Sequence, residues 1–209
     1  MNELEFIRSQ VSTERSHMAA VRSACAAALA LAADPRPDID FLAACAGYLI
    51  FSVGRFNAQD QAHCGLLRPR LPADAARDLA TLDELEQTLG MSRKAIEPLA
   101  TALGTLESGT GDAAEFTAAL RTYLSFYSGV LAPRRHALRH LFDAHYGIAD
   151  WRAASAVDAD SILEERERYA RVADLRPGGI ALGAQGTDAP VPPPLSGSAA
   201  QAATRPTGP

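Results

Sequence analysis

The chain has 209 residues, of which 47% are hydrophobic and 22% are charged, and its 25 acidic and 20 basic side chains give a formal net charge of −5. This length suits one domain with an appendage, and the composition excludes a fibre, a collagen-like repeat and a wholly disordered chain. The acidic balance argues against a nucleic-acid partner, since nonspecific binding of nucleic acid goes with a basic excess or a basic stripe.

The sequence has the features of a cytoplasmic protein. Its three cysteines, Cys25, Cys45 and Cys64, are an odd number without CxxC spacing, so we expect free, buried thiols. The longest apolar run, over 24–33, is shorter than the roughly 20 residues of a membrane span. Acidic residues precede this run, where a signal peptide needs a basic start. We therefore expect a reducing, cytoplasmic location and no membrane partner.

Apolar residues recur at steps of three and four residues along most of the chain, and no run alternates as a strand does. This pattern predicts an all-α fold. The first helix is expected over 3–32, where Pro35 and Pro37 stop it, and the second from Asp38 or Asp40 to the residues before Pro69. Each is long enough to cross a small domain.

The next two predicted helices contain residues that interrupt helices. The third is expected over 73–106, where Gly90 and Pro98 indicate a break into two pieces. The fourth is expected over 113–145, with a kink at Pro133 because a proline inside a helix removes one hydrogen bond and clashes with the preceding turn. Four long helices joined by short connections predict an antiparallel four-helix bundle.

The C-terminal part of the chain adds a short helix and a tail. A helix is expected over 160–175, opening with Ser161 and Glu164 at capping-box spacing and then exposing the charged run that begins at Glu165. We expect this helix to pack across the bundle through Ile162, Tyr169 and Val172, which completes a domain over 1–175. Residues 176–209 are rich in Pro, Gly and Ala and contain no aromatic residue, so they predict a disordered tail.

Polar residues on the apolar helix faces are the main chemical signal. Glu14-x-x-His17 on the first helix and Asp60-x-x-His63 on the second each place a carboxylate and an imidazole one turn apart. Burying an unpaired carboxylate is costly. Dinuclear metal bundles use acid-x-x-His pairs that project inward from facing helices. The spacing therefore predicts a transition-metal site whose ligands are Glu14, His17, Asp60 and His63.

Two further histidines extend this ligand set. His136 and His140 lie four residues apart on the fourth helix, so both imidazoles can reach one metal ion. Arg55, Gln59 and Arg135 are then expected to hold the ligands in place from outside the coordination sphere. The alternative is that the two histidines lie on a solvated flank, since arginines alternate with them in the sequence.

The segment from Tyr48 to His63 resembles the second-helix signature of the hemerythrin-like (HHE cation-binding) four-helix bundles, in which a His-Phe-x-x-Glu-Glu run supplies metal ligands. Arg55-Phe56-x-x-Gln59-Asp60 keeps the phenylalanine and one acid but has an arginine at the family's first histidine. His17 matches the family's first-helix histidine. The predicted third helix, in contrast, has no histidine where the family places ligands.

This resemblance implies a metal centre or the loss of one. One possibility that it implies is a rearranged site, using Asp60 and His63, for one or two non-haem iron ions or for another transition metal. The other is a bundle that has lost its iron. The associated functions are sensing of oxygen, nitric oxide or redox state and metal-dependent oxidation. Glu14-x-x-His17 is equally similar to the ferritin-like carboxylate bundles.

Two hypotheses without a metal stay open. The first is a helical regulatory module whose inward acids pair with Arg55, Arg134 or Arg135 and whose charged C-terminal helix and tail bind a protein partner. The second is an enzyme that holds an anionic small molecule in a pocket beside the proline kink, lined by Tyr123, Tyr127 and Arg134. Convergence of acids and imidazoles would favour the metal, whereas an arginine among the carboxylates would favour the regulatory module.

Overall fold

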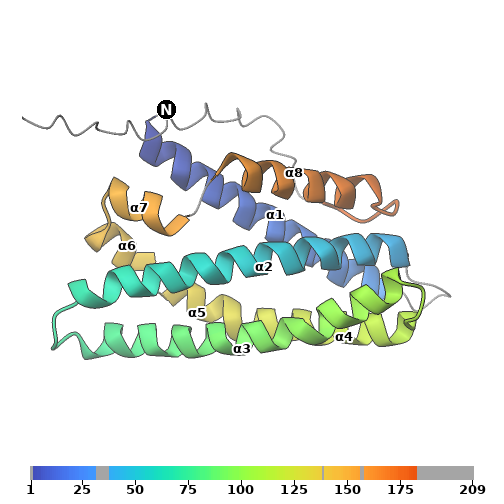
Figure 1. Ribbon diagram of the computed structural model, residues 1–209, viewed down its shortest axis with the longest axis horizontal. Helices are drawn as coiled ribbons and strands as arrows, with labels where there is room; N and C mark the ends of the chain where they lie inside the picture. Colours follow the sequence, from blue (N-terminus) through green and yellow to red (C-terminus); the bar gives the residue numbers. More distant parts are fainter. Residues whose placement is uncertain (1, 32–37, 138, 156–157, 183–209) are drawn as a thin grey trace, which may run out of the picture.

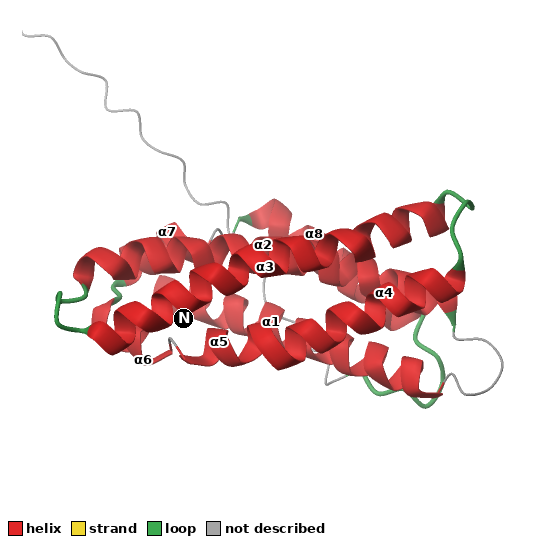
Figure 2. Ribbon diagram, turned by 90° about the horizontal axis from the view of Figure 1, so that it is seen from below, coloured by secondary structure: helices red, strands yellow, loops and turns green. Residues whose placement is uncertain are grey.

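The computed structural model describes residues 2–31, 38–137, 139–155 and 158–182. Every regular element in these ranges is a helix, and Figure 2 shows the same, so the predicted all-α fold is confirmed for this part of the chain. The α-helices are α1 (Glu3–Leu31), α2 (Ile39–Leu67), α3 (Ala76–Glu107), α4 (Ala113–Phe126), α5 (Ala132–Ala137), α6 (Arg139–His145), α7 (Ile148–Ser155) and α8 (Ala159–Asp174). A 3₁₀ turn, η1 (Arg68–Arg70), follows α2, and a π-helical turn, η2 (Tyr127–Leu131), follows α4.

Helix α2 is the central element of the molecule. It packs against α1, α3, α7 and α8, and α3 and α8 lie on opposite sides of it (Figure 1). A helix with neighbours on several sides is apolar around much of its circumference. By length and composition alone, α2 and η1 together could cross a membrane, but the core helix of a soluble protein passes the same test. Its apolar character is explained by its central position, and the expected absence of a membrane partner stays a prediction.

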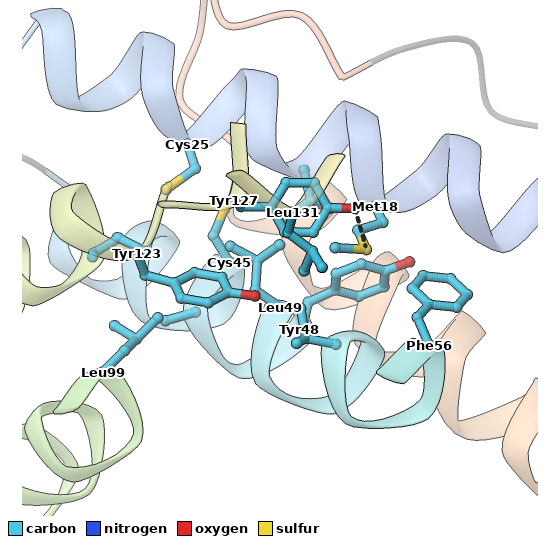
Figure 3. Packing of buried hydrophobic residues seen from close by; sticks show 14 of the residues in the cluster. Met18, Cys25, Cys45, Tyr48, Leu49, Phe56, Leu99, Tyr123, Tyr127 and Leu131 are labelled. Atoms are coloured by element: carbon cyan, nitrogen blue, oxygen red, sulfur yellow. Dashed lines mark hydrogen bonds between the residues drawn. The ribbon is translucent and has the colours of Figure 1, made fainter. Parts of the chain in front are cut away.

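The apolar core is built from aromatic, aliphatic and sulfur-containing side chains of the long helices and η2 (Figure 3). Cys25, Cys45 and Cys64 are free and buried, as the sequence predicted. A hydrogen bond with Cys25, and then burial, raise the pKa of the Cys45 thiol. Cys45 is therefore a structural residue, since only the thiolate is a strong nucleophile.

The third helix is not broken. Helix α3 runs from Ala76 to Glu107 with Pro98 inside it, so the predicted division into two pieces is wrong. Pro98 lies on the exposed side of the helix, where the carbonyl group it leaves unbonded can face water. The buried side chains of Leu89 and Leu99 on either side hold the helix in the core.

The fourth predicted helix, over 113–145, is helical at every described residue: α4, η2 and α5 follow one another without a gap, and α6 begins after residue 138, which lies outside the described residues. The irregularity expected at Pro133 is a π-helical turn that ends just before it. Pro133 has no N–H group to donate to the carbonyl four residues before it. Just before it, the N–H of Ala132 bonds to the carbonyl of Tyr127, five residues back, which gives a π-helical turn. This turn places Tyr127 and Leu131 in the core. Single π-helical turns inside α-helices often occur at functional sites.

Helix α8 packs against α1 and α2 through Ile162, Tyr169 and Val172, as predicted. Its N-cap is Asp158, whose carboxylate accepts from the Ser161 N–H at 2.8 Å, rather than the expected capping box. Beyond α8, the side chains of Ile180 and Leu182 are buried in the core. The packed chain therefore extends past the expected boundary at residue 175, and the rest of the expected tail, 183–209, lies outside the described residues.

Ile180 tests how much the segment after α8 stabilises the fold. The change Ile180→Ala removes buried methyl groups and leaves a cavity, so we expect the free energy of unfolding to fall by about 2 kcal/mol or more. Urea denaturation measures this change. The control Leu31→Ala alters a side chain that is 67% exposed and is expected to change stability by about 0.5 kcal/mol at most. Equal stability of the two variants would contradict the packing of this segment.

Candidate functional site

The acids and histidines of the two acid-x-x-His pairs are all buried, each at most 8% exposed. They do not share one site, and most of them belong to two separate clusters of polar side chains. One group, which we name the α8 cluster, lies where α8 meets α1 and α2 and consists of Glu14, His17, Tyr48, Arg55 and Glu165. The other, which we name the Asp60 cluster, joins α1, α2, η2 and α5 and consists of Arg15, Asn57, Asp60, Tyr127 and Arg135.

Glu165 of α8 is the centre of the α8 cluster. Its Oε1 accepts a hydrogen bond from the Tyr48 hydroxyl at 2.6 Å and lies 2.9 Å from Nδ1 of His17. The His17 ring stacks on Tyr169, with ring centroids 3.9 Å apart. Glu165 was predicted to be exposed in a charged run, and this prediction is wrong: Glu165 is 1% exposed, because it lies on the face of α8 that packs on α1 and α2.

Glu14 lies beside a guanidinium group. Its Oε1 accepts from Nη2 of Arg55 at 3.4 Å and from Nε2 of Gln10 at 3.5 Å. Burial raises the pKa of Glu14; Arg55 lowers it and the nearby Glu165 raises it, and the net effect is upward. Arg55 also donates to the Ser161 carbonyl at 3.0 Å. Arg55, predicted to support a metal site, is therefore the counterion of Glu14 and a link to α8.

Both carboxylate oxygens of Asp60 accept hydrogen bonds from arginines. Oδ1 accepts from Nη2 of Arg15 at 3.0 Å, and Oδ2 accepts from Nε of Arg135. Arg135, only 8% exposed, also donates to the Tyr127 hydroxyl at 3.1 Å and to Oδ1 of Asn57 at 2.9 Å. Burial lowers the pKa of Arg135, but Asp60 and Tyr127 raise it more, so its guanidinium stays charged. Arg135 is thus the counterion of Asp60.

His63 lies among aromatic rings from α6, α7 and the residue after α6. The centroid of its ring lies 4.7 Å from that of Phe142, 5.4 Å from that of Tyr146 and 5.6 Å from that of Trp151. Its Nδ1 lies 3.1 Å from the Tyr146 hydroxyl. Burial lowers the pKa of His63 to about 4, although Asp60 acts in the opposite direction. His63 is therefore neutral near pH 7.

Glu14, His17, Asp60, His63 and His140, the predicted metal ligands whose side chains the structure describes, do not converge on one point. Among the residues it describes, no three His, Cys, Asp or Glu side chains form a group that could hold a metal ion. His140 is exposed and its Nε2 lies 3.3 Å from Asp78, while the side chain of His136 lies outside the described part of the structure. Gln59 donates to the Ser155 carbonyl instead of supporting a ligand. The described donors do not fit an iron centre.

A pocket of about 660 Å³ runs along α1 and is closed by residues of α2, α3, η2, α5, α6 and α7. Its volume is in the range of small-molecule sites. Four arginines and one carboxylate line it: Arg8, Arg15, Arg22, Arg135 and Asp60. The other lining residues are Val11, Ser12, Ser16, Met18, Ala19, His63, Leu85, Tyr127, Ala132, Phe142 and Trp151. The pocket is therefore cationic, in a chain with a net negative charge.

Three of the pocket arginines form a stripe on α1. They are seven residues apart, so they lie on one face at intervals of about two helical turns. Each guanidinium lies over an aromatic ring, which orients it by a cation–π interaction. The distances to the ring centroids are 5.1 Å for Arg8 over Trp151, 5.0 Å for Arg15 over Phe56 and 4.1 Å for Arg22 over Tyr127.

Among the four arginines that line the pocket, Arg22 is the one for which no hydrogen bond or ion pair to a described residue is seen. Its Nε is buried and makes no hydrogen bond, and none of the described carboxylates pairs with it. An unsatisfied buried donor costs about 1–3 kcal/mol, and more where the group is charged. Tyr127, over which Arg22 stacks, is fixed by Arg135 and by a hydrogen bond to the Met18 sulfur, drawn in Figure 3. An anionic oxygen at this end of the pocket would satisfy Arg22.

One of the residues that line this pocket was predicted from the sequence to line a pocket. Tyr127 was expected to line a pocket for an anion and lines this arginine-rich pocket, but Tyr123 and Arg134, expected beside it, do not. Tyr123 is buried in the core, and Arg134 is exposed and pairs with Glu84. The seven-residue spacing of the α1 arginines is a signal in the sequence that would have indicated the correct residues. Glu165 also has such a signal, since it lies three residues after Ile162 and four before Tyr169, on the face of α8 that was predicted to pack on the bundle.

Comparisons with protein-family models, with curated proteins and with solved structures found no match. The site is therefore interpreted from its own geometry. That geometry consists of two buried arginine–carboxylate clusters and a cationic pocket that borders the Asp60 cluster.

The Asp60–Arg135 pair gives a first test of this geometry. The change Asp60→Asn leaves the buried Arg135 without its counterion, so we expect it to lower the free energy of unfolding by about 3–5 kcal/mol. The double variant Asp60→Leu/Arg135→Met removes both charges and is expected to recover much of that loss. Urea denaturation measures both. Asp78→Asn, which alters a more exposed ion pair, is the control, and an equal effect of D60N and D78N would contradict the pairing.

His63 gives a second test, through the pH dependence of stability. Its pKa falls from 6.5 to about 4 on folding, so between these pH values the unfolded chain binds more protons. The stabilisation from neutral His63 is therefore complete above pH 6.5 and is lost as the pH falls to about 4, a change of about 3 kcal/mol. Denaturation at several pH values should show this loss in the native protein and in His140→Gln, but not in His63→Gln. The same acid dependence in the native protein and in both variants would contradict this role of His63.

Proposed function

We propose that this protein is a helical binding module that holds an anionic small molecule in its arginine-lined pocket. The observation that carries the proposal is the pocket of about 660 Å³ in which four arginines face one carboxylate. We also infer the bundle architecture: α1, α2, α3 and the helical segment from α4 to α6 form an antiparallel four-helix bundle, and α7 and α8 pack on its outside.

Arg22 is the main recognition group in this proposal. Its guanidinium presents donors in a fixed plane, which suits two parallel hydrogen bonds to one oxyanion. The Tyr127 ring 4.1 Å away holds that plane in place. Arg15 shares Asp60 with Arg135, so two positive charges face one negative charge in the middle of the pocket. An anionic ligand would neutralise this excess.

The described contacts support a regulatory role more than a metal-dependent one. Arg55 pairs with Glu14 and Arg135 with Asp60, which is the arrangement expected of a regulatory module with an arginine–carboxylate core. The pocket is lined by α1, η2, α5, α6 and α7, so a bound anion would tie these elements together and stabilise the folded chain. Iron binding, implied by the hemerythrin resemblance, stays a prediction.

Removal of the Arg22 charge tests the proposal. We expect at least one of the anions benzoate, octanoate and inorganic phosphate to raise the melting temperature of the protein. The cation choline should not raise it. Arg22→Gln should weaken their binding at least tenfold, because a hydrogen bond to a charged group contributes about 1.5–3 kcal/mol. Isothermal titration calorimetry measures the affinity. The control is Arg93→Gln, an exposed position on α3. No anion binding, or equal binding by R22Q and R93Q, would contradict the proposal.

A further inference from the structure

The two ends of the pocket differ in chemistry. Arg22 and Tyr127 lie at one end, and Trp151, beneath the Arg8 guanidinium, lies at the other. Because α1 rises about 1.5 Å per residue, the stretch from Arg8 to Arg22 is about 21 Å long. Phe142 adjoins Trp151, with ring centroids 5.7 Å apart. The pocket is therefore elongated, with an unsatisfied cation at one end and aromatic rings at the other.

Much of the wall between these ends is small or apolar, and the charged groups that also border it, Arg15, Asp60 and Arg135, are paired with one another. On α1 the side chains between the arginines that line the pocket are small or apolar and include Val11, Ser16, Met18 and Ala19. The Ser16 hydroxyl already donates to the Ser12 carbonyl at 2.9 Å, so it needs no partner from a ligand. Small side chains allow an extended chain to lie close against the helix. Leu85 and Ala132 add apolar surface from α3 and α5.

The charged groups in the middle of the pocket have partners within the protein, whereas the buried Trp151 Nε1 at the far end makes no hydrogen bond. Arg135 donates to Asp60, Tyr127 and Asn57, and Arg15 donates to Asp60. Arg8 also has a partner. Arg22 is left as the position where one planar oxyanion gains most, because its side chain lines the pocket and none of the described carboxylates pairs with it. A single guanidinium matches a single carboxylate in two parallel hydrogen bonds.

We infer that the ligand is an amphiphilic carboxylate whose head group binds Arg22 and whose apolar chain or ring system lies along α1 towards Phe142 and Trp151. This inference rests on the proposed anion-binding function and specifies its ligand. Affinity then has two separable parts. The head group contributes through Arg22, and the apolar body contributes through the length of surface it buries.

A chain-length series tests this inference. Isothermal titration of the full chain with acetate, butyrate, octanoate and dodecanoate, each below its micelle concentration, should show affinity rising with length, by at least tenfold from butyrate to octanoate. Arg22→Gln should reduce octanoate binding at least tenfold and leave the weaker binding of octanol unchanged. Inorganic phosphate is titrated alongside as an anion without an apolar body.

A steric block separates the apolar contact from the charge. Ser16 is exposed on the pocket face of α1, so Ser16→Phe should fold normally, obstruct the path of the chain and reduce octanoate binding at least tenfold while acetate or phosphate binding is retained. Ser23→Phe places the same side chain at an exposed position of α1 that does not line the pocket, and it should bind octanoate as the native protein does.

The outcomes distinguish this inference from the function on which it rests. If phosphate, acetate and octanoate bind equally well and all depend on Arg22, the pocket binds anions but the apolar part of the inference is wrong. If octanoate and octanol bind equally and R22Q changes neither affinity, the pocket is apolar, and both the proposed function and the inference are wrong. If none of these probes binds to the native protein, the proposed function fails together with the inference.

Discussion

Asp60 accepts hydrogen bonds from two arginines in the interior, and most of the candidate site depends on this shared carboxylate. A buried guanidinium needs a counterion and acceptors for its remaining donors, and Arg135 finds these in Asp60, Tyr127 and Asn57. The π-helical turn that carries Tyr127 is positioned by the same contacts. Arg15, the second arginine on Asp60, brings excess positive charge to the pocket on α1.

Asp60 and His63, two of the predicted metal ligands, make other contacts in this structure. A carboxylate whose two oxygens already accept from guanidinium groups has lost the freedom to approach a cation, and a second cation nearby would repel the first. His63, only three residues further along α2, is neutral and lies among aromatic rings. The acid-x-x-His spacing therefore serves two separate purposes in α2, an ion pair and an aromatic cluster.

In the α8 cluster, the two buried carboxylates have different kinds of partner. Glu165 accepts a hydrogen bond from Tyr48 and lies beside His17, while Glu14 relies on Arg55. These contacts connect α8 to the two helices on which it lies, α1 and α2, in addition to the apolar contacts of Tyr169 and Val172. Helix α8 is thus attached by polar interactions that require one orientation, whereas apolar packing alone would allow several.

Periodicity in the sequence determined the helices and their buried faces, because both depend on local spacing. The described ends of α1 and α2 lie within a residue or two of the predicted ones. The burial of Glu14, His17, Asp60 and His63 was predicted as well. The partners of those residues were decided by tertiary structure. Which arginine reaches Asp60 depends on the π-helical turn before Pro133, and which acid reaches His17 depends on the rotation of α8. Such contacts join residues far apart in the chain, and helical spacing carries no information about them.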